Sequence, residues 1–282
     1  GMTPRRWLDV HLPLLPSTLT RLCLNSHSWK TPIGSVQFPA TLEHLEIGCR
    51  VLDSLTWIFS LPLLHTLKLV RIGEVEDLEE SFENLQHSNL TTLHFSFLPG
   101  DSNGELRLSK VLYRMETLFP SLLHLQDFGM IPCDIDSYRS EDYKGVWRTS
   151  LNNKVNLKTL SCPYTPKTTL PETLTELRWL RTRMSLDDSS ETYTLSRDEV
   201  VRLPPTLTIL YAPHQQLERN DFELLPRTLT SLTIRSTGPE FKFSTLPPLL
   251  TYFDACSYSW SDERLKAILK NLPHLNTLTG CG

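Results

Sequence analysis

The chain has 282 residues, with 28 lysines and arginines against 32 aspartates and glutamates, and its formal net charge is -4. This slightly acidic balance argues against a dedicated nucleic-acid binder. No apolar run approaches the roughly 18 residues that a membrane span needs, so we expect no membrane partner. Leucine supplies 53 of the 282 residues, and one residue type that abundant indicates a repeat.

One phrase recurs along the chain. Its five closest copies begin at Leu15, Phe38, Leu170, Leu203 and Leu225, and read LPSTLTRLCL, FPATLEHLEI, LPETLTELRW, LPPTLTILYA and LPRTLTSLTI. Looser copies begin at Leu61, Ser88, Phe119, Val155, Leu246 and Leu272. The anchor, which we define as the second apolar residue of each L-x-x-L, falls at positions 22, 45, 67, 93, 125, 160, 177, 210, 232, 253 and 278. Eleven units therefore recur with a mean step of about 26 residues.

Each unit predicts one short strand. In L-x-x-L-x-L the last two leucines alternate with polar residues, so one strand face is buried and the other faces water. Because one such strand buries too little surface alone, we expect the strands to stack in parallel about 4.8 Å apart. They should begin near Thr20, Glu43, His65, Thr91, Lys158, Thr175, Thr208, Thr230 and Thr251. We expect the fifth unit to be irregular, because its buried pair is either Leu122 and Leu125 or Leu123 and Phe128.

The segments between the strands differ in pattern. Apolar spacing predicts helices over residues 54–60, 75–86, 109–118 and 262–272. In the last of these, Leu265, Ile268, Leu269 and Leu272 fall at i, i+3, i+4 and i+7. The capping-box sequence from Ser196 to Glu199 predicts a further short helix before Leu203.

The phrase and its period resemble the leucine-rich-repeat superfamily over nearly the whole chain, from about Leu14 to Leu278. The L-P-x-T-L-x-x-L-x-L form is most similar to FNIP-type and related short repeats and, second, to the L-P-rich repeats of bacterial effector proteins. The resemblance implies an α/β fold: a curved solenoid with parallel strands on the concave face and short helices, 3-10 turns or extended segments on the convex side. We expect a single domain over residues 1–282, with an N-terminal cap over roughly residues 1–14.

The chain departs from this family at one position. The asparagine usual three residues beyond the last strand leucine is replaced by His27, Arg50, Ile72, Thr182, Gln215, Thr237 and Tyr258. Without that amide to bond the backbone of the turn, we expect looser and less uniform turns.

Nine histidines and six cysteines raise the question of a metal or catalytic site. His44, His65, His94 and His124 lie on or near successive strands, but no carboxylate or cysteine stands at ligand spacing. The cysteines form no C-x-x-C pair, and no H-E-x-x-H, G-x-S-x-G or glycine-rich phosphate motif occurs. The bacterial effectors carry their catalytic cysteine in a separate helical domain after the repeats. We therefore expect no enzyme activity, no cofactor and no metal.

The residues between the two final strand leucines form the expected working surface on the concave face. They read Cys23, Glu46, Lys68, His94, an unassigned fifth residue, Ser161, Arg178, Tyr211, Thr233, Asp254 and Thr279. Their mixed charge favours a polypeptide over a phosphate backbone. The insertion over residues 134–149 adds aromatic side chains among charges. We predict a protein-binding site formed by Lys68, His94, Arg178 and Tyr211, with Tyr143 or Trp147 from the insertion.

These observations favour a non-enzymatic scaffold that binds another protein, with two alternatives open. The first is the substrate receptor of an F-box type ubiquitin ligase, which requires a helical module ahead of the first repeat, where only about a dozen residues stand. The second is an enzyme or metal protein built on the solenoid, which requires a carboxylate, a histidine and a cysteine to converge.

Three further expectations follow from the repeat. The chain shows no signal-peptide core, and its sequon at Asn89 falls on a strand, so we expect a cytoplasmic protein. Parallel stacking should place Cys256 beside Cys281, because each lies six residues after the first leucine of its repeat. The last strand should have an exposed edge, which predicts either a longer native chain or an edge-to-edge homodimer.

Overall fold

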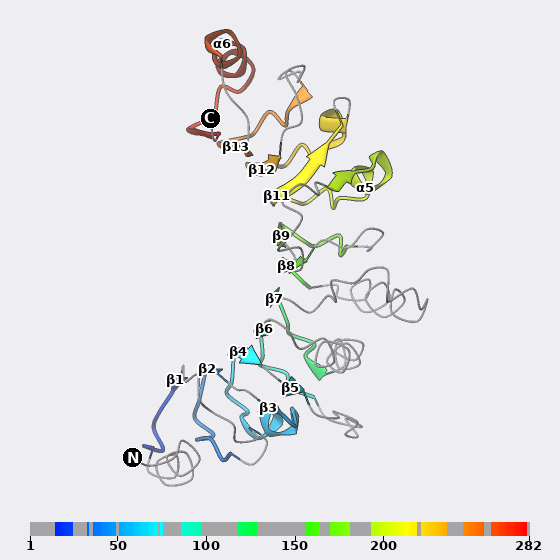
Figure 1. Cartoon of the computed structure of the whole chain (residues 1–282). Helices are drawn as coiled ribbons and strands as arrows, with labels where there is room; N and C mark the ends of the chain where they lie inside the picture. Colours follow the sequence, from blue (N-terminus) through cyan, green and yellow to red (C-terminus); the bar gives the residue numbers. More distant parts are fainter. Residues whose placement is uncertain are drawn as a thin grey trace. The chain divides into compact units, whose positions relative to one another are not determined.

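A computed structural model describes residues 15–24, 33, 36–48, 51–72, 74–75, 86–97, 118–128, 156–163, 170–180, 193–218, 221–235, 245–256 and 261–280. The chain divides into two compact units, Gly1–Asn156 and Leu157–Gly282. Each unit is a solenoid of parallel strands with few helices, which confirms the predicted stacking (Figure 1). Of the helices that these residues form, none combines the length and the apolar composition of a membrane span.

Among the described residues of the first unit, five strands pair in chain order, each parallel to the next. They are β1 (Arg21–Leu24), β2 (His44–Gly48), β4 (Thr66–Ile72), β6 (Thr92–Phe97) and β7 (His124–Phe128). A second, shorter parallel ladder joins β3 (Val51–Leu52) to β5 (Glu74–Val75). Between β3 and β4 the chain forms a 3-10 helix, η3 (Thr56–Ser60), which buries Trp57 and Ile58.

The described part of the second unit repeats this arrangement with six strands paired in parallel. They are β8 (Thr159–Pro163), β9 (Glu176–Leu180), β11 (Ile209–Leu217), β12 (Ser231–Arg235), β13 (Tyr252–Cys256) and β14 (Thr277–Thr279). β10 (Tyr193–Leu195) pairs with the second half of the long strand β11. The helical segments are α5 (Arg197–Val201), η4 (Asp221–Leu224) and α6 (Asp262–Asn271).

The anchor residues are aligned on consecutive strands within each unit. In the first unit the aligned residues are Leu22, Leu45, Leu67, Leu93 and Leu125. In the second unit they are Leu160, Leu177, Leu210, Leu232, Phe253 and Leu278. All except Leu278 are buried, and each buried side chain contributes roughly 1.5–3 kcal/mol to stability. The repeat period in the sequence is therefore the stacking period of the strands.

Each predicted strand begins one residue after its expected start, because the residue before it still belongs to the turn. The carbonyl of Thr20, for example, accepts hydrogen bonds from both Glu43 N and His44 N, at 2.8 and 3.0 Å. The turns themselves also recur: the amides of Leu42, Leu174 and Leu207 each donate to the carbonyl of the proline three residues earlier, at 3.1 Å.

The expected irregularity of the fifth unit was wrong. Leu122 and Leu125 are only 1% and 3% exposed, and β7 pairs with β6 without a register shift. The reason is local, since the amide of Leu122 donates to the Phe119 carbonyl at 3.1 Å, the same turn that precedes other strands. That turn selects the first of the two registers that the sequence permits.

The predicted helices are confirmed in part. The segment 54–60 forms a 3-10 helix, and the segment 262–272 forms α6, which buries Ile268 and Leu272. Leu269, expected on the buried side, is 63% exposed, because successive helical residues are about 100° apart and only a narrow stripe of α6 meets the core. Most of the segments 75–86 and 109–118 lies outside the described residues.

The predicted capping box of Ser196 and Glu199 at the start of α5 is confirmed. The backbone amide of Ser196 donates to the Glu199 carboxylate at 2.8 Å, and the Ser196 hydroxyl donates to the same oxygen at 2.9 Å. This contact satisfies a backbone donor at the start of the helix, where no intrahelical acceptor exists.

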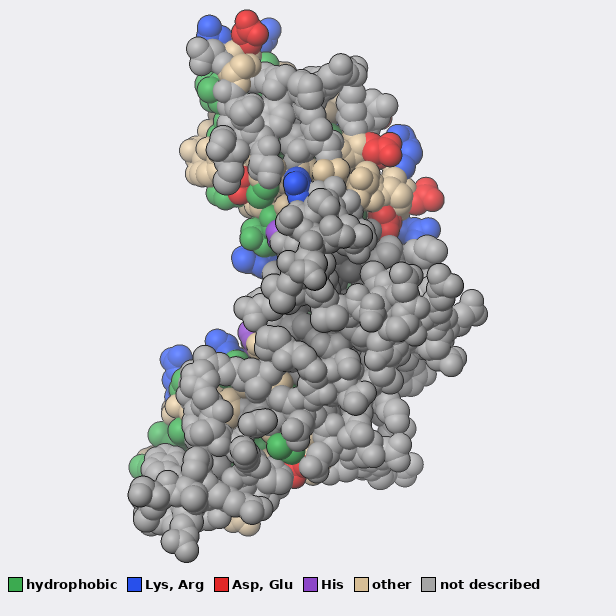
Figure 2. Space-filling model, viewed as in Figure 1, with side chains coloured by type: hydrophobic (Ala, Val, Ile, Leu, Met, Phe, Trp, Pro, Cys, Tyr) green, Lys and Arg blue, Asp and Glu red, His purple; other side chains and the backbone are tan. Residues whose placement is uncertain are grey.

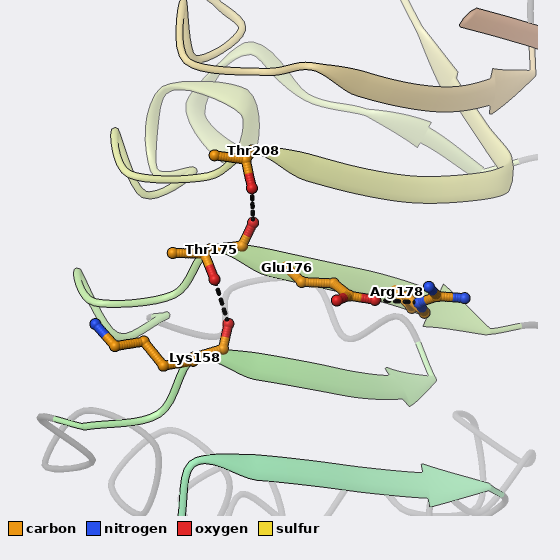
Figure 3. A network of polar contacts seen from close by, with 5 residues as sticks. All are labelled: Lys158, Thr175, Glu176, Arg178 and Thr208. Atoms are coloured by element: carbon orange, nitrogen blue, oxygen red, sulfur yellow. Dashed lines mark hydrogen bonds and ion pairs between the residues drawn. The ribbon is translucent and has the colours of Figure 1, made fainter. Parts of the chain in front are cut away.

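Two rows of threonines connect successive turns at the starts of the strands. In the first row, four residues before the anchor, the hydroxyls of Thr41, Thr173, Thr206 and Thr228 donate to backbone carbonyls of the preceding turn. In the second row, two residues before the anchor, the hydroxyls of Thr91, Thr175, Thr208, Thr230 and Thr251 donate to the carbonyl at the same position one strand earlier. Figure 3 shows this second contact for Thr175 and Thr208. Hydroxyl ladders therefore reinforce the strand entrances.

The loose turns expected where the family carries asparagine lie mostly outside the described residues. Of the two such positions that the structure describes, Ile72 is buried on β4. Gln215 is buried on β11, and its side-chain oxygen has no hydrogen-bond partner.

Candidate binding face

The outward residues between the strand anchors are aligned from strand to strand, as the sequence predicts. In the first unit the row consists of Cys23, Glu46, Lys68, His94 and Gln126, so Gln126 is the fifth residue that the sequence left unassigned. In the second unit it consists of Ser161, Arg178, Tyr211, Thr233, Asp254 and Thr279.

In the first unit this row is polar and internally paired. Lys68 Nζ lies 3.6 Å from Glu46 Oε2 on the neighbouring strand. His94 is half-buried, and this burial lowers its pKa below the ordinary value of 6.5. The hydrogen bond with Gln126 and the Glu46 carboxylate act in the opposite direction on this pKa, while the Lys68 cation lowers it further. The structure thus favours a neutral imidazole between a cation and an amide.

In the second unit two predicted residues form an exposed stacked pair. The guanidinium carbon of Arg178 lies 5.9 Å from the centroid of the Tyr211 ring, within the range of a cation–π contact. The Nε of Arg178 also donates to the carboxylate of Glu176 on the same strand (Figure 3). Tyr211 remains 37% exposed, so the pair is held in place and still meets solvent.

Two members of the row are not on the wet surface as expected. Ser161 and Thr233 are only 3% and 4% exposed. Both are small side chains aligned with a longer neighbour, Ser161 with Arg178 and Thr233 with Tyr211. Outward orientation alone therefore does not make a strand residue accessible.

The predicted site residues come together as two pairs. Lys68 and His94 are aligned neighbours on β4 and β6 of the first unit, and Arg178 and Tyr211 are aligned neighbours on β9 and β11 of the second. Tyr143 and Trp147 lie outside the described residues, so their part in the site stays a prediction. Cys281 also lies outside them, so its predicted neighbourhood with Cys256 stays a prediction too.

The histidines that the sequence singled out do not converge on a metal centre. In the part of the chain that the structure describes, no three side chains of His, Cys, Asp or Glu are close enough to hold a metal ion.

The charged side chains around α5 and α6 in the second unit alternate in sign, with red and blue groups side by side in Figure 2.

Sequence reasoning missed the threonine rows and one ion pair between an exposed arginine and a buried carboxylate. Asp221, at the start of η4, is 2% exposed and accepts a 3.2 Å contact from Arg197 of α5. The ion pair has no sequence signal, because 24 residues separate its partners. The threonine rows did have a signal, namely the recurrence of threonine at fixed positions in L-P-x-T-L-T.

No protein-family model matches the chain, and no curated protein matches its sequence. The function is therefore inferred from the side chains on the outward strand faces.

Proposed function

We propose that the chain is a non-enzymatic leucine-rich-repeat protein that binds another protein on the outward faces of its strands. The regular leucine register, the step of about 26 residues and the short returning segments support the assignment to leucine-rich repeats. In repeat proteins of this kind the stacked elements present an extended surface that suits a macromolecular partner. Because one fold can serve many functions, the fold alone does not define a partner. The specific support comes from the side chains on the outward faces of the strands.

The observation that carries the proposal is the exposed pair of Arg178 and Tyr211. Arginine and tyrosine are among the residue types that most often dominate interface energies. Here the Glu176 carboxylate and the tyrosine ring hold the guanidinium in place before any partner arrives. Because the ordering of a long side chain is one cost of association, a side chain that is already ordered binds at a lower cost.

The first prediction tests this pair with selected peptides. A random peptide library is panned against the full chain at pH 7.5, and the affinities of enriched peptides are measured by calorimetry. Arg178→Ala and Tyr211→Ala should each weaken binding by about 1–3 kcal/mol. Neither change removes a buried core side chain, so the free energy of unfolding should change by less than about 0.5 kcal/mol. Arg178→Lys keeps the charge without the planar stacking group and should lie between wild type and alanine.

Arg202→Ala is the matched control, since Arg202 is exposed at the end of α5 and away from the strand face. Equal affinities for the Arg178 and Arg202 variants would remove the basis for the proposal. Loss of binding together with loss of folding would instead assign these residues a structural role.

A further inference from the structure

Four of the nine histidines of the chain belong to one part of the first unit. His44 and His124 are outward residues at the same register position on β2 and β7, with β4 and β6 between them. His94 lies on β6, one outward position further along, and His65 immediately precedes β4. His44, His65 and His124 are exposed, whereas His94 is half-buried. Figure 2 shows basic and histidine side chains along the margin of this unit where β2, β4 and β6 lie.

Among the described residues, the permanent charges aligned with these histidines cancel. Arg21 on β1 and Lys68 on β4 supply two cations, while Glu46 on β2 and Glu43 just before it supply two carboxylates. One pair of these opposite charges, Lys68 and Glu46, is in contact at 3.6 Å. The remaining side chains of the two aligned rows that hold these residues are uncharged: Cys23, Thr66, Thr92 and Gln126. The net charge of this surface is therefore decided by its imidazoles.

Histidine is the side chain whose ordinary titration falls between pH 8 and 5. Three exposed imidazoles, those of His44, His65 and His124, lie on this surface beside permanent charges that balance in the described residues. The carboxyl groups of aspartate and glutamate in a peptide stay ionised until pH falls to about 4. Between pH 7.5 and 5.5 the surface thus gains positive charge while an acidic peptide keeps its negative charge.

We propose that this surface, the histidine face formed by Arg21, His44, His65, Lys68, His94 and His124, binds an acidic polypeptide segment and binds it more tightly as the pH falls. The proposal rests on the proposed function only in assigning polypeptide binding to outward strand faces, since it concerns other residues in the other unit. A polypeptide is favoured over nucleic acid because Glu43 and Glu46 stand among the cations, where a continuous phosphate backbone would meet them. The carboxylates of an acidic polypeptide are spaced apart along its chain, so they can contact the cations without meeting Glu43 or Glu46.

The second prediction tests the histidine face with defined probes. A fluorescently labelled decaglutamate peptide is titrated with the full chain at pH 7.5, 6.5 and 5.5, and binding is followed by fluorescence anisotropy. We expect binding about tenfold tighter at pH 5.5 than at pH 7.5, because three exposed ion pairs each add a modest contribution. The triple variant His44→Gln, His65→Gln and His124→Gln should lose this pH dependence, and raised salt should weaken the binding of the wild type.

A second variant acts in the opposite direction. Glu46→Gln removes one carboxylate from the histidine face and should tighten decaglutamate binding at every pH. The matched control is His274→Gln, which replaces an exposed histidine of the second unit and should leave the pH dependence intact. Circular dichroism at each pH confirms that each variant is folded.

The outcomes separate this proposal from the function proposed above. Binding that is independent of pH, or unchanged in both the triple variant and Glu46→Gln, overturns the histidine face. Equal or tighter binding of a labelled ten-nucleotide single strand, with the same histidine dependence, overturns the assignment to a polypeptide. If Arg178→Ala abolishes decaglutamate binding while the triple variant does not, the histidine face is overturned and the Arg178 and Tyr211 surface stands.

Discussion

At the scale of single residues, threonine has a larger part than its sequence pattern reveals. In L-P-x-T-L-T the threonines read as polar spacers between leucines. In the structure their hydroxyls donate across to the preceding turn, and several turns are connected in this way. A short branched side chain suits this role, because it reaches the neighbouring carbonyl with little loss of rotamer freedom.

The third prediction concerns Thr208, in the second of these rows. Its hydroxyl donates to the Thr175 carbonyl at 2.9 Å, and that carbonyl also accepts the amides of Thr208 and Ile209. Thr208→Val keeps the shape and removes one hydrogen bond without leaving the carbonyl unpaired. We expect the free energy of unfolding to fall by about 0.5–1 kcal/mol, measured by chemical denaturation. Thr279→Val, on the exposed side of β14, is the control, and an equal loss there would contradict the role of the ladder.

The fourth prediction concerns the pH dependence of stability at His94. Its folded-state pKa lies below the ordinary 6.5, chiefly because of burial, so the folded state binds fewer protons at this site than the unfolded chain. The contribution of His94 to stability is therefore present above pH 6.5 and is lost as the pH falls from 6.5 towards the lowered value. We expect this loss to be small, because the site is only partly buried and solvent screens its charges.

Denaturation curves of wild type and His94→Gln between pH 7.5 and 5 provide the measurement. The variant should show a flatter dependence on pH over this range, while His274→Gln should follow the wild type. Parallel curves for wild type and His94→Gln would show that another group is responsible.

At the scale of elements, local signals sufficed where a segment closes its own hydrogen bonds. The proline-led turns, the contact between Ser196 and Glu199, and α6 all follow from residues a few positions apart. The attachment of α5 to η4 does not, because it depends on the ion pair of Arg197 and Asp221. The second oxygen of the Asp221 carboxylate has no hydrogen-bond partner. Among the described residues, this buried carboxylate forms its ion pair with Arg197.

At the scale of the whole molecule, each unit is stabilised by contacts between neighbouring turns, since a turn pairs with the one before it and the one after it. In the second unit β11 pairs with β9 and β12, whereas the described pairing of β14 in the sheet is with β13. Stability in such an array is close to a sum over turns and their interfaces. The same substitution should therefore change the free energy of unfolding by different amounts in β11 and in β14.

The fifth prediction compares equivalent anchors at those places. Leu210→Ala leaves a cavity between two packed neighbours and should cost about 3–5 kcal/mol, whereas Leu278→Ala removes a half-buried side chain and should cost about 1–2 kcal/mol. Chemical denaturation of both variants provides the comparison. Similar losses would show that the strands of this unit unfold as one cooperative block rather than turn by turn.

The sequence by itself determined the repeat period, the parallel stacking and, outside the fifth unit, the residues that share the outward face. These features depend on leucines at a fixed spacing and on the alternation of strand side chains, both of which are local and recur in every turn. It also placed Lys68 beside His94 and Arg178 beside Tyr211, because parallel stacking brings equal repeat positions together.

Only the tertiary structure decided which outward residues are accessible and which polar groups bond between turns. Ser161 and Thr233 are buried although they occupy outward positions, and the pairing of Arg197 with Asp221 joins segments 24 residues apart. The fifth unit shows the same division: its sequence allowed two registers, and the turn at Phe119 together with the pairing of β7 to β6 selected one. Accessibility and long-range pairing are properties of neighbours in space, so a repeat pattern along the chain does not encode them locally.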